Sequence, residues 1–139
     1  LIPSILATWW YFAPGMDKQP WRRVGTLLSE QCRPGDIILV NEPHQTIAFE
    51  RYFNERKGVE VEGYPEIGGV RITTDNFDRW FLPLVRNRER VWFIRMSATA
   101  STSDPQGLGL SWLNENMKLR TRVKEPGYNG DVEVFLFDR

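Results

Sequence analysis

The stretch Arg33-Pro34-Gly35-Asp36-Ile37-Ile38-Leu39-Val40 decides the fold class. Its Pro-Gly-Asp part predicts a turn, because Pro and Gly interrupt regular structure. The four apolar residues that follow are mostly β-branched, which is typical of a strand covered on both faces. We therefore predict the middle strand of a sheet at residues 37–40.

Helical and extended patterns alternate around this strand. Helices are expected at residues 17–32, 45–55, 77–85 and after Asp104, and further strands at 59–64, 90–96, 121–124 and 132–137. Pro83 should kink or shorten the third helix, because proline has no backbone N–H to donate. The alternation predicts an α/β fold, a three-layer Rossmann-like sandwich with a mainly parallel sheet of about five strands. The pair Asn129-Gly130 marks a turn, so we expect the last two strands to form a C-terminal antiparallel hairpin.

The composition fits one soluble domain. The 139 residues are 41% hydrophobic and 26% charged, close to the average for globular domains. Since 18 basic residues balance 18 acidic ones, no net field attracts nucleic acid, and we expect no nucleic-acid partner. The single cysteine, Cys32, excludes an internal disulfide and is predicted to be a packed thiol.

The start of the chain is apolar and ends in four consecutive aromatic residues. These are Trp9, Trp10, Tyr11 and Phe12. The segment is shorter than the roughly 20 apolar residues that span a bilayer. Two interpretations remain open: the outer end of a transmembrane helix with its interfacial aromatic residues, or an arm folded onto the domain. We therefore divide the chain into a membrane-proximal or N-terminal arm at 1–16 and a single α/β domain at 17–139, with the four aromatic residues as candidates for membrane or partner contact.

Two loops are the candidate ligand-binding positions. In open α/β sheets, ligands bind beyond the carboxyl ends of the strands, where the strand order reverses. One loop follows strand 37–40 and the other follows strand 90–96. The candidate ligand-binding residues in these loops are Asn41, Glu42, His44, Gln45, Ser97 and Asp104.

The same loops carry no recognisable catalytic signature. The spacing permits a Ser-His-Asp arrangement of Ser97 or Ser101 with His44 and Asp104, but no Gly-x-Ser-x-Gly turn exposes a serine. Glu42 and Asp104 could act as an acid–base pair, although capping a helix is the commoner use of Asp before Pro. No glycine-rich phosphate loop follows the middle strand, so we expect no cofactor. With one histidine and one cysteine we expect no metal site, and we assign no catalytic residue.

Several segments together resemble a known domain. They are Gln19-Pro20-Trp21-Arg22 opening a helix, Arg33-Pro34-Gly35-Asp36 before the strand Ile37 to Val40, a Tyr52-bearing helix, Arg90-Val91-Trp92-Phe93-Ile94, and the closing Phe135-Leu136-Phe137. From Asp17 to Arg139 the chain resembles the C-terminal extracytoplasmic domain that follows the last transmembrane helix in polytopic membrane glycosyltransferases. The similar enzymes are of the dolichyl-phosphate-mannose mannosyltransferase and aminoarabinose-transferase-like type.

The resemblance implies an accessory role. Enzymes of this type move a sugar from a polyprenyl-phosphate donor, and their catalytic acidic residue lies in the membrane portion, so no catalytic residue carries over to this chain. The resemblance implies a membrane-anchored parent protein with this domain on the extracytoplasmic, periplasmic side. Its implied partners are the membrane portion of the same polypeptide and a glycan or lipid-linked sugar. The alternative is a stand-alone Rossmann-like domain that binds a small ligand between the two loops.

Overall fold

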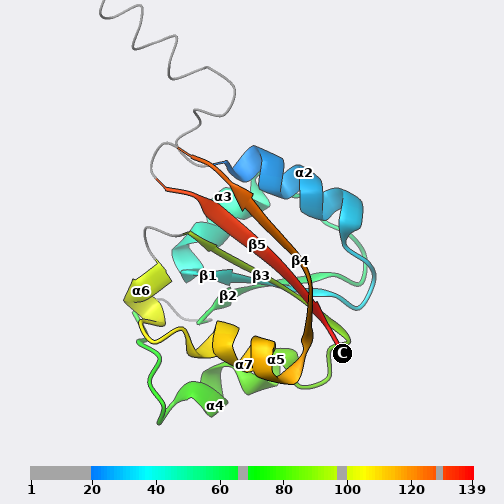
Figure 1. Cartoon of the computed structure of the whole chain (residues 1–139). Helices are drawn as coiled ribbons and strands as arrows, with labels where there is room; N and C mark the ends of the chain where they lie inside the picture. Colours follow the sequence, from blue (N-terminus) through cyan, green and yellow to red (C-terminus); the bar gives the residue numbers. More distant parts are fainter. Residues whose placement is uncertain (1–19, 66–68, 97–99, 128–129) are drawn as a thin grey trace, which may run out of the picture.

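The computed structural model describes residues 20–65, 69–96, 100–127 and 130–139. In these residues one sheet has the strand order β2-β1-β3-β5-β4 (Figure 1). The strands are β1 (Ile37–Asn41), β2 (Glu60–Tyr64), β3 (Arg90–Met96), β4 (Lys118–Glu125) and β5 (Val132–Asp138). The α-helices are α2 (Trp21–Gln31), α3 (Thr46–Glu50), α4 (Phe77–Trp80), α5 (Leu82–Val85), α6 (Ala100–Ser103) and α7 (Leu108–Asn116), with a 3₁₀ turn, η1 (Pro43–Gln45), before α3.

The sheet is mixed, so the predicted Rossmann-like sandwich with a mainly parallel sheet is wrong. Strand β1 pairs in parallel with β2 and β3, whereas β5 pairs antiparallel with both β3 and β4. The reason is the C-terminal hairpin, which adds to the sheet as a unit with β5 on the inside. Six of the seven residues of β5 are buried, while β4 alternates exposed and half-buried positions as an edge strand does. The middle strand is therefore β3, and β1 lies between β2 and β3.

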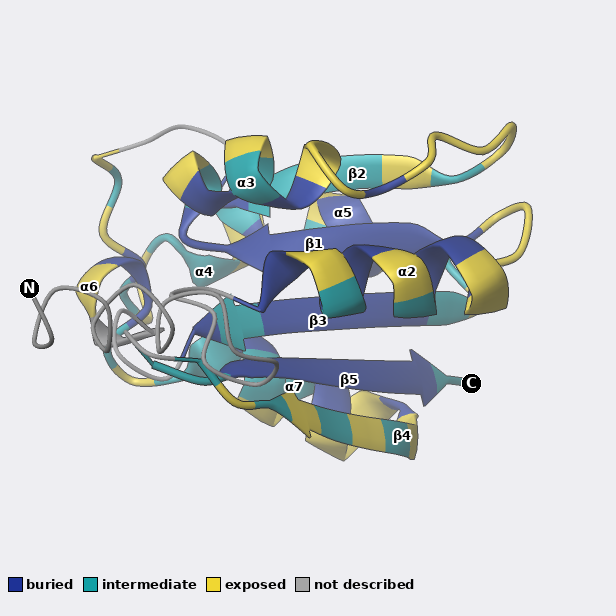
Figure 2. Cartoon of the chain, turned by 90° about the horizontal axis from the view of Figure 1, so that it is seen from above, coloured by how far each residue is buried: buried dark blue, intermediate teal, exposed yellow. Residues whose placement is uncertain are grey.

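Helices pack on both faces of this sheet because successive strand residues point to opposite sides. Ile38 and Val40 join one buried cluster with residues of α2 and α3. Ile37 and Leu39 join the other cluster with residues of α5 and α7. Figure 2 shows β1, β3 and β5 as the buried strands, with α2 and α3 lying across one face. The continuous apolar run of β1 is thus explained by burial on both sides.

Two of the expected helices are shorter in the structure. The helix expected at 45–55 is reduced to η1 and α3, and at Tyr52 the backbone packs on α2 instead. A Cβ atom on Gly25 would lie 2.4 Å from the carbonyl oxygen of Tyr52, so the two segments are in direct backbone contact. The helix expected at 77–85 is divided into α4 and α5, with Pro83 in the first turn of α5, where its missing N–H is tolerated.

Asp36 joins the beginnings of β1 and β3. Its side chain is 2% exposed, and its carboxylate accepts hydrogen bonds from Trp92 Nε1 at 2.9 Å and Arg90 Nε at 3.0 Å. The backbone N–H of Arg33 donates to the same carboxylate at 2.9 Å, which closes the turn before β1. These bonds hold two strands at the end of the sheet opposite the candidate site.

Candidate functional site

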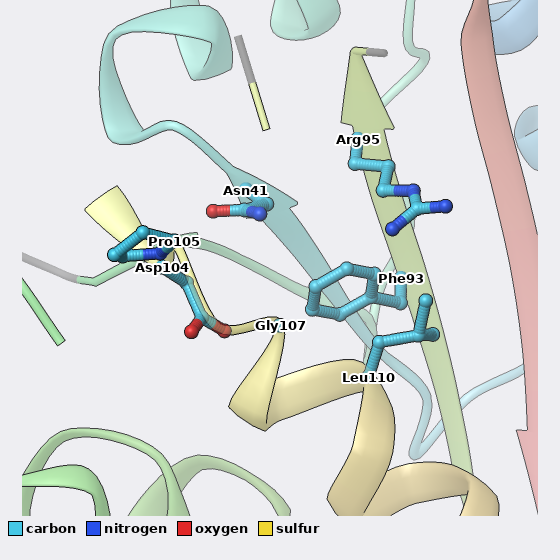
Figure 3. A pocket seen from close by; sticks show the side chains of 7 residues that line it. All are labelled: Asn41, Phe93, Arg95, Asp104, Pro105, Gly107 and Leu110. Carbon is cyan, nitrogen blue, oxygen red and sulfur yellow. The ribbon is translucent and has the colours of Figure 1, made fainter. Parts of the chain in front are cut away.

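A pocket lies at the carboxyl ends of β1 and β3. Because β1 and β3 are parallel with Val40 opposite Ile94, the next position along each strand places Asn41 beside Arg95. The strand order reverses here, since the chain goes from β1 to β2 on one side and returns to β3 on the other. The pocket has a volume of about 190 Å³ and is lined by Asn41, Phe93, Arg95, Asp104, Pro105, Gly107 and Leu110 (Figure 3).

Asn41 is the last residue of β1 and presents a free donor to this pocket. Its side chain is 4% exposed, and its Oδ1 accepts the backbone N–H of Glu42 at 3.0 Å, which fixes the orientation of the amide. Among the described residues, Asn41 Nδ2 has no hydrogen-bond partner. Figure 3 shows this nitrogen turned toward Arg95. A buried N–H group of this kind needs an acceptor that the described residues do not supply.

Glu42 connects the two predicted loops. Its Oε1 accepts the backbone N–H of Ser103 at 3.0 Å and the hydroxyl of Thr102. Its backbone has φ +75°, a left-handed conformation that non-glycine residues rarely adopt. Such conformations persist only where the surroundings enforce them, and they cluster at ligand sites. Glu42 therefore acts as a tether that sets the shape of the pocket wall.

Asp104 caps α7. Its Oδ1 accepts the N–H of Leu108 and its Oδ2 the N–H of Gly109, both at 2.9 Å, so the carboxylate satisfies the free donors at the helix N-terminus. The hydroxyl of Tyr64 also donates to Oδ2 at 3.0 Å. Burial, followed by the charge and hydrogen bond of Asp104, raises the pKa of Tyr64, so the phenol stays protonated as the donor.

Arg95 is the pocket residue that the sequence analysis did not single out. Its guanidinium Nε and Nη2 both contact Glu133 Oε1 at 3.2 Å, and Arg122 Nη2 contacts Glu133 Oε2 at 2.8 Å. Two arginines thus share one carboxylate, and the group keeps a net positive charge. Arg95 Nη1 has no hydrogen-bond partner in the described part of the chain. The only sequence signal was a charged residue within the buried strand 90–96.

The other predicted site residues are only partly brought together. The side chain of His44 is 63% exposed, with its Nδ1 3.7 Å from Glu42 Oε2 and its Nε2 3.2 Å from Gln45 Nε2. Gln45 is buried but does not line the pocket. Ser97 lies outside the described residues, as do the four aromatic candidates Trp9, Trp10, Tyr11 and Phe12.

The described residues give no hydrogen bonds that support either acid–base arrangement considered from the sequence; Ser97 and the side chain of Ser101 lie outside what the structure describes. Asp104 bonds to the helix N-terminus and to Tyr64, and the acidic neighbour of His44 is Glu42. Glu42 and Asp104 each have their own structural hydrogen bonds, and in the described residues no hydrogen bond joins the two carboxylates. Cys32 is buried, and burial raises the pKa of its thiol, in keeping with a packed side chain.

Within residues 20–65, 69–96, 100–127 and 130–139, no group of three His, Cys, Asp or Glu side chains is placed to hold a metal ion. No helix in these same ranges is long and apolar enough to cross a bilayer. Comparison of the chain with protein-family models, with curated proteins and with solved structures finds no match.

Proposed function

We propose that this chain is the extracytoplasmic accessory domain of a membrane-embedded glycosyltransferase that uses a polyprenyl-phosphate sugar donor. In this proposal the domain does not catalyse the transfer. It supports the membrane portion of the same polypeptide, which carries the catalytic residues, and it shapes the access of the acceptor.

The observation that supports the proposal is the meeting of separate motifs in one buried structure. Asp36, from the Pro-Gly-Asp turn, bonds to Arg90 and Trp92 of the second motif. Trp21, from the motif that opens the first helix, lies in the same buried cluster as Trp92. The residues that carry the resemblance thus belong to the core of the domain, where they would matter for its fold.

The hydrogen bonds of the acidic residues support a non-catalytic role. Glu42 and Asp104 both accept backbone N–H groups, and Asp104 also caps α7. A carboxylate that serves as an acid or base must exchange protons with a substrate, and these two are instead engaged in holding loops and a helix.

The first test is the reading frame upstream of Leu1 in the parent gene. We expect several apolar segments of about 20 residues, the last of which runs into residues 1–12. A start codon or a signal peptide directly before Leu1 would overturn the proposal. The purified 139-residue chain, assayed with a polyprenyl-phosphate-linked sugar, should show no transfer.

A second test uses the parent enzyme. Asp36→Ala breaks the buried bonds between β1 and β3, so we expect sugar transfer by the parent enzyme to fall. Asp138→Ala is the matched control, because Asp138 pairs with Arg120, whose side chain is 51% exposed. Equal activity of the two variants would contradict a supporting role for this domain.

A further inference from the structure

We infer that the pocket between β1 and β3 binds the carboxylate of a compact organic acid. This inference goes beyond the proposed function and does not depend on it, because it uses only the pocket itself. The pocket is small: its volume of about 190 Å³ is below the roughly 300–1,000 Å³ of typical ligand pockets, so it suits a compact ligand.

The free polar groups of the pocket are both donors. Asn41 Nδ2 and Arg95 Nη1 lack hydrogen-bond partners within the described residues, and both residues line the pocket. Figure 3 shows Asn41 at the end of β1 and Arg95 on β3, with the Arg95 guanidinium extending toward β5, where it contacts Glu133. Two N–H donors in one pocket favour a ligand with acceptor oxygens. Because a guanidinium binds charged acceptors more strongly than neutral ones, a carboxylate is favoured over a hydroxyl or an amide.

The charges around the pocket are compatible with a bound anion. Arg95 and Arg122 share Glu133, which leaves one positive charge in that group. Asp104 is negative, but the N–H groups at the start of α7 and the Tyr64 hydroxyl occupy its oxygens. Glu42 does not line the pocket, and its Oε1 is held by Ser103 and Thr102.

The remaining walls are apolar. Phe93, Pro105 and Leu110 line the pocket with an aromatic ring and aliphatic surface. Ligand sites typically combine such apolar walls with a few placed polar groups. The body of the acid would lie against this surface with its carboxylate between the two donors.

The test is a titration of the ¹⁵N-labelled chain with benzoate, followed by NMR of the Asn41 amide and the Arg95 guanidinium. Benzoate should shift both side-chain signals with a dissociation constant of about 1 mM or lower. Benzamide has nearly the same shape without the charge, and it should bind at least about tenfold more weakly. Equal binding of benzamide, or no shift at either side chain with benzoate, would overturn the inference.

Variants of Asn41 and Arg95 test whether these two residues are the hydrogen-bond donors to the ligand. Asn41→Asp keeps an oxygen for the Glu42 N–H but replaces the donor by a negative charge, and Arg95→Gln removes the guanidinium while Glu133 keeps Arg122. Each should weaken benzoate binding about tenfold or more. Arg120→Gln, on the edge strand outside the pocket, should bind as the unmodified chain does.

A neutral sugar provides the last arm of the test. Methyl glucoside presents hydroxyl oxygens to the same donors, and we expect it to bind more weakly than benzoate. Tighter binding of the sugar, or benzoate binding that is unchanged in Arg95→Gln, would show that the pocket does not recognise a carboxylate. The Arg95→Gln result stays decisive even if Asn41→Asp does not fold.

Discussion

Asp36 is the residue whose loss should destabilise the protein most clearly through lost hydrogen bonds. Asp36→Ala leaves the buried N–H of Trp92 unsatisfied and the mostly buried Arg90 without its carboxylate. Breaking a buried charge pair from one side costs about 3–5 kcal/mol, and urea denaturation would measure the change in the free energy of unfolding.

The control for Asp36→Ala is Asp138→Ala. It removes an ion pair with the half-exposed Arg120 and should cost no more than about 1 kcal/mol. If Asp36→Ala also lowered the free energy of unfolding by less than about 1 kcal/mol, the hydrogen bonds of Asp36 between β1 and β3 would not contribute substantially to stability.

Because of Glu133, the free energy of unfolding of the protein should decrease as the pH is lowered. Burial alone raises the pKa of its carboxyl, but the hydrogen bond from Arg122 and the charges of Arg95 and Arg122 outweigh it, so its pKa lies below the ordinary value of 4.5. A depressed pKa means that its stabilising contribution is complete above pH 4.5 and is lost as the pH falls through the folded-state value.

Comparison with Glu133→Gln isolates this contribution. We expect the unfolding free energy of the unmodified chain to exceed that of the variant near neutral pH, and the difference to shrink as the pH falls below 4.5. Chemical denaturation at a series of pH values measures it. A difference that stays constant through this range would contradict the stabilising role of the two arginines.

At the scale of single elements, α2 depends on a glycine in its interior. Alanine in place of glycine normally stabilises a helix by about 0.5–1 kcal/mol. At Gly25 the added Cβ would lie 2.4 Å from the Tyr52 carbonyl oxygen, which is backbone and cannot rotate away. Gly25→Ala should therefore destabilise the protein by about 1–3 kcal/mol, as overpacking does, in thermal or urea denaturation.

The neighbouring position on α2 provides the control for Gly25→Ala. Thr26 is exposed, and its hydroxyl bonds only to the Arg22 carbonyl one turn earlier in the described structure. Thr26→Ala should be neutral or stabilising by a few tenths of a kcal/mol, because alanine has the higher helix propensity. A stabilising Gly25→Ala would mean that α2 and the Tyr52 backbone are not in contact.

The sequence predicts best the elements whose secondary structure follows from the pattern of their own residues. Strand 90–96 coincides with β3, because its apolar run is buried whatever its neighbours are. The expected 45–55 helix is much shorter: α3 ends at Glu50, and the backbone at Tyr52 contacts Gly25 of α2. Contacts of this kind link distant positions, and no local periodicity contains them.

The candidate site shows the same contrast: the sequence predicts residues from their local pattern, but not the contacts between residues far apart in the chain. Asn41 was predicted because it directly follows an apolar strand. The sequence analysis did not predict Arg95 as a site residue. Its partner, Glu133, lies on β5, and the sequence does not show that β5 is the strand that pairs with β3. Asp104 was predicted as either a cap or an acid–base residue, and the observed bonds to α7 correspond to a cap.

For the whole molecule, the strand order is the feature that sequence patterns could not supply. Burial patterns distinguish an interior strand from an edge strand, and the apolar residues of β5 contrast with the alternation of β4. Burial patterns carry no information on strand direction. The alternation of helices and strands predicts a mainly parallel sheet, and only the final turn indicates the antiparallel hairpin of β4 and β5. The antiparallel pairing of β5 with β3 is what makes the sheet mixed.

Amide hydrogen exchange tests this strand order directly. Strand β5 lies between β3 and β4, so consecutive amides along Val132–Asp138 bond to one neighbour and then the other, and all should exchange slowly. Strand β4 has only β5 beside it in the described structure, so every second amide should exchange fast. Edge strand β2 is the internal control and should alternate in the same way. Alternating protection along β5, or continuous protection along β4, would show that the hairpin joins the sheet in the opposite order.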